Sequence, residues 1–559
     1  MWTTPRSYCA NRDFFKVGKK VKKGEGIHLP PFSMNFSRER TFSGRRAPLG
    51  LVLFAVLVAS SVLIPLLYLV VRALEADSSS LREIVFRERN LTLLGNTFLL
   101  AISVLIGTTL LALPAAWLLA RVKLPFLRFW VVANTLPLAV PGYVGAFALL
   151  AASGSGGTLE AIGLSLPRPS GFWGATWILT LYSAPYLFVN LYAALQNTDP
   201  ALEEAAQSLG HSRWQSFWRV TVPQLRPAWL SGALLITLHV LGDFGVVSLM
   251  RFETFSYAIY SQYISSLDRV YAAWLALILL VITVLILGLE GVAMRRVFLA
   301  RNAKNTRPAA RVSLGLWSIP AMIPLVLYVA IAVVLPIVTA IHWMAREPQS
   351  QFYNPWAELL RATLGTLSAA APAAFLSAIC ALPLAYLAVR HKTKFSSWLE
   401  RSSYLGYATP PLALALALIF VTLRIVPDLY QTLWLLIFAY TVHFLAESIG
   451  PIRSQLHQTP VRLEEAARSL GLRGWQVIVK VLIPLLARGV LAGIALAFLS
   501  AAKELPITTL LAPPGFESLA KNVYGYTSEA MFGKAAPHAL ALILVSSAFI
   551  GLVLPDKRR

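Results

Sequence analysis

Apolar runs of about 20 residues recur along the whole chain and alternate with short polar segments. A helix of this length crosses the hydrocarbon core of a bilayer with its backbone hydrogen bonds satisfied internally. A transmembrane β-barrel would instead show segments of about 10 residues with alternating polarity, and the sequence lacks that pattern. We therefore predict an all-α membrane protein with about 12 transmembrane helices. The expected spans are 49–72, 95–120, 129–152, 174–195, 229–250, 271–293, 316–342, 362–389, 402–423, 432–449, 489–512 and 536–555.

The composition agrees with a membrane protein. Of the 559 residues, 57% are hydrophobic and 13% are charged, whereas a soluble protein has about 25% charged residues. The net charge of +23 would by itself suggest a nucleic-acid partner. Membrane proteins, however, concentrate Lys and Arg in cytoplasmic loops for topological reasons, so we expect no nucleic acid to bind. Cys9 and Cys380 lie far apart in the sequence, which argues against a disulfide or a metal site.

The distribution of positive charge predicts the orientation of the spans. If both termini lie in the cytoplasm, the inside segments hold 36 of the 49 Lys and Arg residues and the outside loops hold 11, while Arg72 and Lys503 lie within spans. The central loop 294–315 alone has six positive residues and no acidic one. Because positive residues accumulate on the cytoplasmic side, we expect both the N-terminus and the C-terminus to be cytoplasmic.

The segments outside the spans complete the predicted domain plan. Residues 1–48 are basic, polar and irregular, so we expect a disordered N-terminal tail. The first apolar run is too long for a signal peptide, and the pattern does not decide whether translation starts at Met1 or Met34. After the tail we expect a first transmembrane unit at 49–293, a basic cytoplasmic linker at 294–315 and a second unit at 316–559.

The two predicted units are related by an internal repeat. Residues 203–225 and 464–486 match at 12 of 23 positions without a gap, at an offset of 261. A second pair of segments, ALPAAWLLAR at 112–121 and ALPLAYLAVR at 381–390, repeats at a similar offset. The chain is therefore a tandem duplication of a six-span unit. An even number of spans gives both halves the same orientation, as a parallel pair related by an axis along the membrane normal.

The most similar repeated segment is a polar loop and not a span. It follows the fourth span of each half and reads as a short helix, a break and a second helix. Early acidic residues suit the positive end of the first helix, small residues allow another surface to approach, a glycine suits a left-handed helix end, and a proline precedes the next span. These positions are Glu203, Glu204, Ala205, Ala206, Gly210 and Pro223 in the first copy, and Glu464, Glu465, Ala466, Ala467, Gly471 and Pro484 in the second.

Two interpretations of this loop are open from its local chemistry. Its helices could lie on the bilayer surface as interfacial amphipathic helices. Alternatively, each loop could dock onto a protein. Lipid packing does not require two cytoplasmic loops to match in register, so the repeat favours a protein partner with two equal docking surfaces.

The loop resembles the E-A-A motif of bacterial ABC importer permeases, in which Glu-Ala-Ala is followed by a glycine and then by two aliphatic residues and a proline. All the fixed positions of the motif occur in both copies. They are Glu204, Ala205, Ala206, Gly210, Val220, Val222 and Pro223, and again Glu465, Ala466, Ala467, Gly471, Val481, Ile483 and Pro484. We call residues 203–223 the first EAA loop and residues 464–484 the second EAA loop. The resemblance covers nearly the whole chain after the tail.

The resemblance implies a type I ABC importer-like fold in the bacterial inner (plasma) membrane. It also implies the partners, namely two copies of an ABC ATPase subunit that fit the EAA loops and a periplasmic or lipid-anchored substrate-binding protein. ATP and Mg would be bound by the ATPase, with no cofactor in this chain, which would be a transport permease and not an enzyme. In agreement, the sequence has no GxxxxGK[ST] phosphate loop.

The expected cargo also follows from resemblance. Fused permeases of this length are most like the ferric-iron branch, and 242–260 and 503–520 resemble the segments that follow the EAA loops there. Permeases for thiamine, 2-aminoethylphosphonate and polyamines share the architecture and stay open as alternatives. A proton-coupled secondary transporter would not explain two matched EAA loops, and no intramembrane His, Asp and Glu constellation supports a membrane-embedded enzyme.

Asp243, Lys503 and Glu504 are charged residues within predicted spans and are candidates for the translocation pathway. Asp243 lies about 14 residues into its span, and Glu504 occupies the equivalent position at the offset of 261, beside Lys503. An acid at the bilayer centre costs about 2.5–3.5 kcal/mol, so both acids should face protein or water. They line the pathway or, alternatively, act as ion-paired packing groups or lie at the outer membrane interface. We expect no permanent metal site, because no His or Cys cluster stands nearby.

Prolines interrupt the third and ninth predicted spans. Pro137 and Pro141 lie in the third span, and Pro410 and Pro411 lie in the ninth. A proline removes a backbone donor, and neighbouring helices can satisfy the freed carbonyls. We therefore expect kinks at these positions.

Overall fold

The computed structural model describes residues 47–75, 87–265, 269–298, 311–346 and 354–553. The chain divides into two units, Met1–Arg40 and Thr41–Arg559. The first unit lies outside the described residues, as does almost all of the predicted disordered tail at 1–48 and most of the linker at 294–315.

The described residues form helices throughout, which confirms the all-α prediction. In the first half the helices are α1 (Leu49–Leu74), α3 (Glu88–Arg121), α4 (Leu127–Thr135), η1 (Leu136–Ala139), α5 (Gly142–Ala152), η2 (Glu160–Ile162), α6 (Gly171–Gln196), α7 (Pro200–Ser208), α8 (Arg213–Ser216), η3 (Phe217–Thr221), α9 (Val222–Gly242), α10 (Gly245–Leu249), α11 (Phe255–Ser265) and α12 (Arg269–Phe298). In the second half they are η4 (Gly315–Trp317), α13 (Ser318–Val329), η5 (Ala330–Val334), α14 (Leu335–Arg346), α15 (Pro355–Arg390), α16 (Lys394–Ala408), α17 (Pro411–Ile425), η6 (Pro427–Leu429), α18 (Leu433–Gln458), α19 (Val461–Ser469), α20 (Gly474–Val477), η7 (Ile478–Leu482), α21 (Ile483–Ala502), α22 (Pro506–Leu511), α23 (Leu519–Ser528) and α24 (Phe532–Val553).

Each predicted span corresponds to an apolar helix or a bent helix pair. Among the described residues, nine helices are long and apolar enough to cross a membrane, and two bent pairs raise this number to 11 if each pair counts as one span. The last predicted span, 536–555, falls on α24, whose described apolar stretch Phe532–Ala548 is shorter.

The third and ninth spans are broken at their prolines. The axis turns by 93° between 127–139 and 142–152, and by 105° between 394–408 and 411–425. Pro141 and Pro410 adopt extended backbone conformations at these breaks, which a residue without an N–H tolerates because no helical donor is lost. The expected kinks are confirmed, and at each of them the helix axis turns by more than 90°.

The fifth and eleventh spans differ from the prediction at both ends. Each helix begins before the predicted span, at Arg213 and Trp475, and passes through a π-helical turn, η3 or η7. The predicted ends at 250 and 512 are wrong, because α9 ends at Gly242 and α21 at Ala502. The short helices α10 and α22 follow each break.

The two halves interlock through the first span of each. Helix α1 packs against α16 and α17 of the second half, while α13 and α14 pack against α4 and α5 of the first half. The Tyr328 hydroxyl donates to the Leu181 carbonyl at 2.9 Å, and the Trp343 indole N–H donates to the Ala151 carbonyl at 2.8 Å. A single buried apolar cluster accordingly includes residues of both halves.

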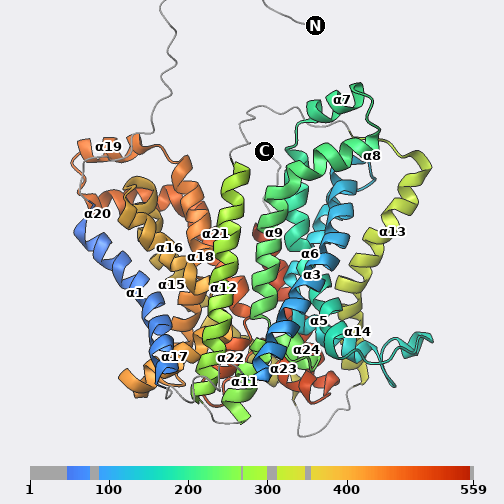
Figure 1. Ribbon diagram of the computed structural model, residues 1–559. Coiled ribbons are helices and arrows are strands. Elements are labelled where there is room, and N and C mark those ends of the chain that lie inside the picture. Colours follow the sequence, from blue (N-terminus) through green and yellow to red (C-terminus); the bar gives the residue numbers. More distant parts are fainter. Residues whose placement is uncertain (1–46, 76–86, 266–268, 299–310, 347–353, 554–559) are drawn as a thin grey trace, which may run out of the picture. The chain divides into compact units, whose positions relative to one another are not determined.

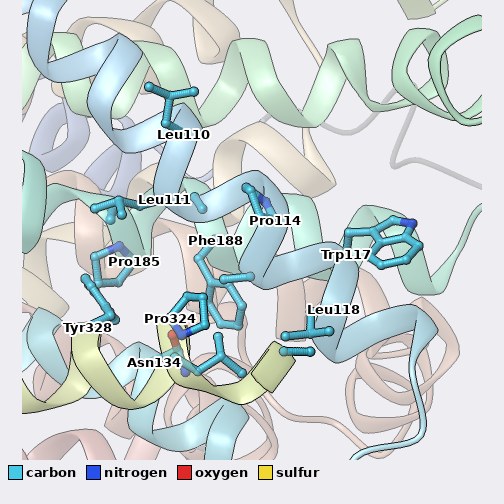
Figure 2. A pocket seen from close by; sticks show the side chains of 15 residues that line it. Leu110, Leu111, Pro114, Trp117, Leu118, Asn134, Pro185, Phe188, Pro324 and Tyr328 are labelled. Carbon is cyan, nitrogen blue, oxygen red and sulfur yellow. The ribbon is translucent and has the colours of Figure 1, made fainter. Parts of the chain in front are cut away.

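An apolar cavity of about 270 Å³ lies where α13 crosses the first half (Figure 2). Its walls come from α3, α4, α6 and α13, with Pro114, Pro185 and Pro324 on three of these helices. No charged side chain lines it. A charged cargo would lose its hydration there without compensation, so we do not assign this cavity to the pathway.

Candidate functional site

Both EAA loops fold into the same helix, break and helix. Helix α7 is followed by Gly210 at φ +90°, and α19 is followed by Gly471 at φ +86°. This left-handed conformation favours glycine because it has no Cβ, so the predicted role of both glycines is confirmed. Figure 1 shows α7, α8, α19 and α20 at one face of the molecule, opposite α11, α17 and α22. We call it the EAA face.

In the second EAA loop, a buried ion pair ties the loop to a transmembrane helix. The Glu464 side chain is fully buried, and its Oε1 accepts a hydrogen bond from Nε of Arg390 at 2.7 Å. Its Oε2 accepts from the Tyr386 hydroxyl at 3.1 Å. Arg390 also donates to the Thr459 carbonyl at 2.8 Å. Because Arg390 is the last residue of α15, these contacts tie the second EAA loop to the end of that span.

The first EAA loop uses an equivalent but more open ion pair. Arg121 at the end of α3 donates to Glu203 Oε1 at 2.8 Å and to Thr198 Oγ1 at 2.6 Å. The Thr221 hydroxyl donates to the same carboxylate oxygen at 2.8 Å. The Glu203 side chain remains 24% exposed, against 0% for Glu464. The EAA motif does not include Arg121 and Arg390, so the sequence analysis did not identify them as site residues. Both are the last residues of the repeated segments 112–121 and 381–390.

The remaining EAA residues divide into a buried side and an outward side. Ala206 and Ala467 are buried against the rest of the loop, whereas Glu204 and Glu465 are exposed. The outward alanines Ala205 and Ala466 are exposed beside these acids, and Pro223 and Pro484 begin α9 and α21. The motif therefore combines residues that are buried within the protein with residues that are accessible at its surface.

Large apolar side chains are exposed on this surface. Leu209 and Leu470 precede the two glycines and are 83% and 85% exposed. Trp214 and Trp475 are also exposed on the second helix of each loop. Beside α19 lies a shallow apolar groove of about 480 Å³ whose lining includes Leu470. Exposed apolar patches of this kind mark interaction sites.

The two predicted pathway acids cap short helices. Asp243 Oδ1 accepts from the Val246 and Val247 amides at 2.9 and 3.4 Å. Glu504 accepts from the Ile507 amide at 2.9 Å and the Thr508 amide at 3.1 Å. Asp243 lies at the end of α9 and not inside a continuous helix as predicted. Among the described residues neither acid forms an ion pair, so capping, not ion pairing, is their observed packing role.

Lys503 joins the two halves at the broken third span. Its Nζ donates to the Leu138 carbonyl at 3.0 Å, and its own carbonyl accepts from the Tyr143 hydroxyl at 3.1 Å. Leu138 belongs to η1 and Tyr143 to α5, so both contacts cross between halves. The break at Pro141 exposes the acceptor that Lys503 uses.

Replacing Lys503 by methionine should lower the melting temperature of the purified protein. A hydrogen bond from a charged donor contributes about 1.5–3 kcal/mol, and the methionine leaves the Leu138 carbonyl unpaired. Scanning fluorimetry in detergent measures the shift. Lys521→Met is the matched control, because Lys521 Nζ donates to the Phe516 carbonyl at 3.0 Å within one half. A K503M variant that melts with the wild type would show that the inter-half bond contributes nothing.

One further intramembrane acid, Glu447 in α18, was not singled out by the sequence analysis. Its apolar neighbours mask it in a hydropathy window, but its position in a membrane-spanning helix is the signal that could have found it. The Ser500 hydroxyl donates to its Oε1 at 2.8 Å. Among the described residues, no group of three or more His, Cys, Asp or Glu side chains could hold a metal ion.

Comparison with known proteins identifies the architecture. The model of the family "Binding-protein-dependent transport system inner membrane component" matches residues 108–346 and again 373–554. The chain belongs to this family. The first match runs from within α3 to the end of α14 and the second from within α15 to residue 554, so the family model matches the chain twice and the protein is a fused ABC transport permease with several membrane-spanning helices.

Individual relatives are also transport permeases. The Fe(3+)-transport system permease protein FbpB 2 of Haemophilus influenzae is 33% identical over 505 residues, which is 90% of this chain and 97% of the relative. The sulfate permease protein CysT of Escherichia coli is 28% identical over 228 residues, 38% of this chain and 76% of the relative. The molybdenum permease protein ModB of Mycobacterium tuberculosis is 34% identical over 189 residues, 32% of this chain and 69% of the relative.

Proposed function

We propose that this permease imports ferric iron across a bacterial inner membrane, driven by ATP hydrolysis on two separate ABC ATPase subunits. One subunit binds each EAA loop, and a substrate-binding protein delivers the cargo at the opposite face. ATP and Mg bind to the ATPases. The EAA face is then cytoplasmic, as the positive charge of 121–128, 294–315 and 450–488 also indicates.

The equivalent geometry of the two EAA loops carries this proposal. Each presents an exposed leucine next to a left-handed glycine, and each is tied by an arginine to the end of a long span. A subunit that pushes on α7 or α19 therefore moves α3 or α15. This is what coupling requires: a docking surface joined rigidly to a helix of the pathway.

The choice of iron rests on the extent of similarity to a named iron permease. That relative matches over nearly the whole of both chains, whereas the sulfate and molybdenum permeases match about a third of this chain. Uptake of radioactive ferric iron, sulfate and molybdate into proteoliposomes with the co-expressed ATPase and binding protein tests the choice. ATP-dependent accumulation of an oxyanion without iron would refute it.

Changing Gly210 and Gly471 together to valine should abolish ATPase binding and uptake. No atom lies within 4 Å of a Cβ built at either glycine, so the substitution acts through the backbone and not through a clash. A β-branched residue disfavours the left-handed conformation, and α7 and α19 lose their orientation. Co-purification with the ATPase measures the effect. Gly288→Val and Gly291→Val are matched controls in open positions on α12. Unchanged ATPase association and uptake would contradict the coupling role.

A further inference from the structure

The apolar cavity of Figure 2 is open at the outer surface of the spans, which is the surface that contacts lipid. Leu110 and Leu111 of α3 line the cavity and are 70% and 38% exposed. Pro114 and Pro324 line it as well and are also exposed. Phe188 of α6, by contrast, lines its inner end and is 3% exposed. The cavity is therefore a recess in the lipid-facing surface and not a sealed void.

The cavity lies in the half of the spans that is nearer the EAA face. Arg121 ends α3 at the first EAA loop, and Leu110 is 11 residues before it, which is about 16 Å along a helix. On α13 the lining begins at Ala321, three residues after the helix starts. The hydrocarbon core of a bilayer is about 30 Å thick. The cavity thus lies beside the acyl chains of the leaflet on the EAA side.

Polar groups at the cavity are already hydrogen-bonded within the protein. Pro185 has no N–H and leaves the Leu181 carbonyl without a helical donor, and the Tyr328 hydroxyl donates to this carbonyl at 2.9 Å. The Asn134 side-chain amide donates to the Trp130 carbonyl at 2.8 Å. No charged side chain lines the cavity. It therefore favours an apolar ligand over an ionic one.

The internal repeat argues that the fold itself does not require this space. Ala115 of α3 and Ala184 of α6 line the cavity. Their counterparts in the second half are Leu384, within the repeated segment 381–390, and Leu445, at the offset of 261. Both leucines are buried, at 0% and 1% exposed. The second half therefore fills with leucine two positions at which the first half leaves space.

An empty cavity of about 270 Å³ is unfavourable, because the atoms that line it lose their dispersion contacts. Water would find few hydrogen-bond partners in an apolar lining. The acyl chains of neighbouring lipids, in contrast, already contact the exposed rim of the cavity. An acyl chain is thus the occupant that the surroundings supply.

Positive side chains gather at the end of the cavity that faces the EAA side. Lys123 lies in the turn between α3 and α4 and Arg128 at the start of α4, and both are exposed. The Lys123 amide donates to the Val312 carbonyl at 3.0 Å, so Arg311 lies beside the same turn. Arg128 is about 9 Å along the helix from Asn134 of the lining. The turn, α4 and α13 contain no acidic residue.

We propose that this cavity binds one acyl chain of an anionic phospholipid from the leaflet on the EAA side. The acyl chain fills the apolar space between α3, α6 and α13, and the phosphate is held by the positive charge of Lys123, Arg128 and Arg311. Basic pockets between membrane-spanning helices bind anionic lipid headgroups in this way. Because α13 belongs to the second half, the lipid contacts both halves. The site is independent of the cargo and of the ATPase.

Native mass spectrometry of the purified full chain tests the acyl-chain part. The delipidated protein is titrated with palmitoyl-oleoyl phosphatidylglycerol, and the wild type should bind one lipid more tightly than any further one. Ala115→Leu with Ala184→Leu should weaken this first step at least about tenfold, since lost burial of two methylene groups already has that effect. Ala321→Leu narrows the cavity from α13 and should act in the same direction. Ala371→Leu, at an exposed position of α15, is the control and should bind like the wild type.

Thermal unfolding excludes misfolding as the cause of lost binding. Without lipid, the variant with both Ala115→Leu and Ala184→Leu should melt at or above the temperature of the wild type, because the added side chains make contacts that the cavity lacks. Phosphatidylglycerol should raise the melting temperature of the wild type and not that of this variant, because a ligand stabilises only the fold that binds it.

Phosphatidylcholine with the same acyl chains tests the headgroup part. The wild type should bind phosphatidylglycerol about tenfold more tightly, and Lys123→Gln with Arg128→Gln should bring the two lipids within about twofold of each other. Arg401→Gln, at an exposed position of α16, is the control and should keep the preference. Wild-type binding by the filled variants, or a first lipid bound no more tightly than later ones, would overturn the acyl-chain site. Equal binding of the two lipids by the wild type would overturn the anionic headgroup.

Discussion

Replacing Arg390 by alanine should destabilise the protein by about 3–5 kcal/mol, the cost of breaking a buried ion pair by removing one partner. Glu464 would be left fully buried, with Tyr386 as a hydrogen-bond donor and Arg468 3.7 Å away as its remaining ion-pair partner. The second EAA loop would also lose its tie to α15. Thermal unfolding of the purified permease should show a markedly lower melting temperature, and ATPase-driven uptake should be lost.

Two variants isolate the cause of that loss. Arg121→Ala removes the equivalent tie in the first half and should cost about 1–3 kcal/mol, because Glu203 is partly exposed and keeps its bond from Thr221. The double variant Arg390→Ala with Glu464→Ala should recover part of the melting temperature but no uptake, because no carboxylate is left unpaired while the tie remains broken. A double variant as unstable as R390A would refute the buried-charge explanation.

Changing Leu209 and Leu470 together to glutamate should abolish ATPase binding while leaving the fold intact. Both side chains are more than four-fifths exposed, so a glutamate at either position should change the folding stability of the isolated permease little. In a docked complex each acid would be desolvated against an apolar surface. A central interface residue is worth at least about 2 kcal/mol, which is roughly 30-fold in affinity for each loop.

Affinity for the ATPase, measured by surface plasmon resonance in nanodiscs, checks this expectation. Leu164→Glu is the matched control, since Leu164 is also exposed but lies before the start of α6, whose other end leads into α7. Equal melting temperatures for all variants would exclude misfolding. Wild-type affinity in the double variant would show that these leucines do not contact the ATPase.

The sequence predicts this fold well where a local rule governs the chain. Span length is set by bilayer thickness, and Gly210 and Gly471 occupy the left-handed ends that their motif requires. The prolines indicated where the two spans break, but not the angle through which the helix axis turns at each break. Pro141 and Pro410 permit a change of direction, but packing against the other half determines its angle.

The sequence fails where side chains from distant segments determine the outcome. Arg121 and Glu203 are 82 residues apart, and nothing in either helix pattern indicates that they pair. The fifth span was predicted to continue beyond Asp243 because the surrounding residues are apolar on average. A hydropathy average does not show that the Asp243 carboxylate caps the next helix. Glu447 was hidden in the same way, by the apolar residues around it in α18.

The central claim is that one chain holds two ATPase subunits, one at each EAA loop. Native mass spectrometry of the nucleotide-free complex counts the bound subunits directly. The wild type should carry two ATPases, L209E and L470E should each carry one, and the double variant should carry none. Two bound subunits in either single variant, or any bound subunit in the double variant, would contradict this account of the EAA loops.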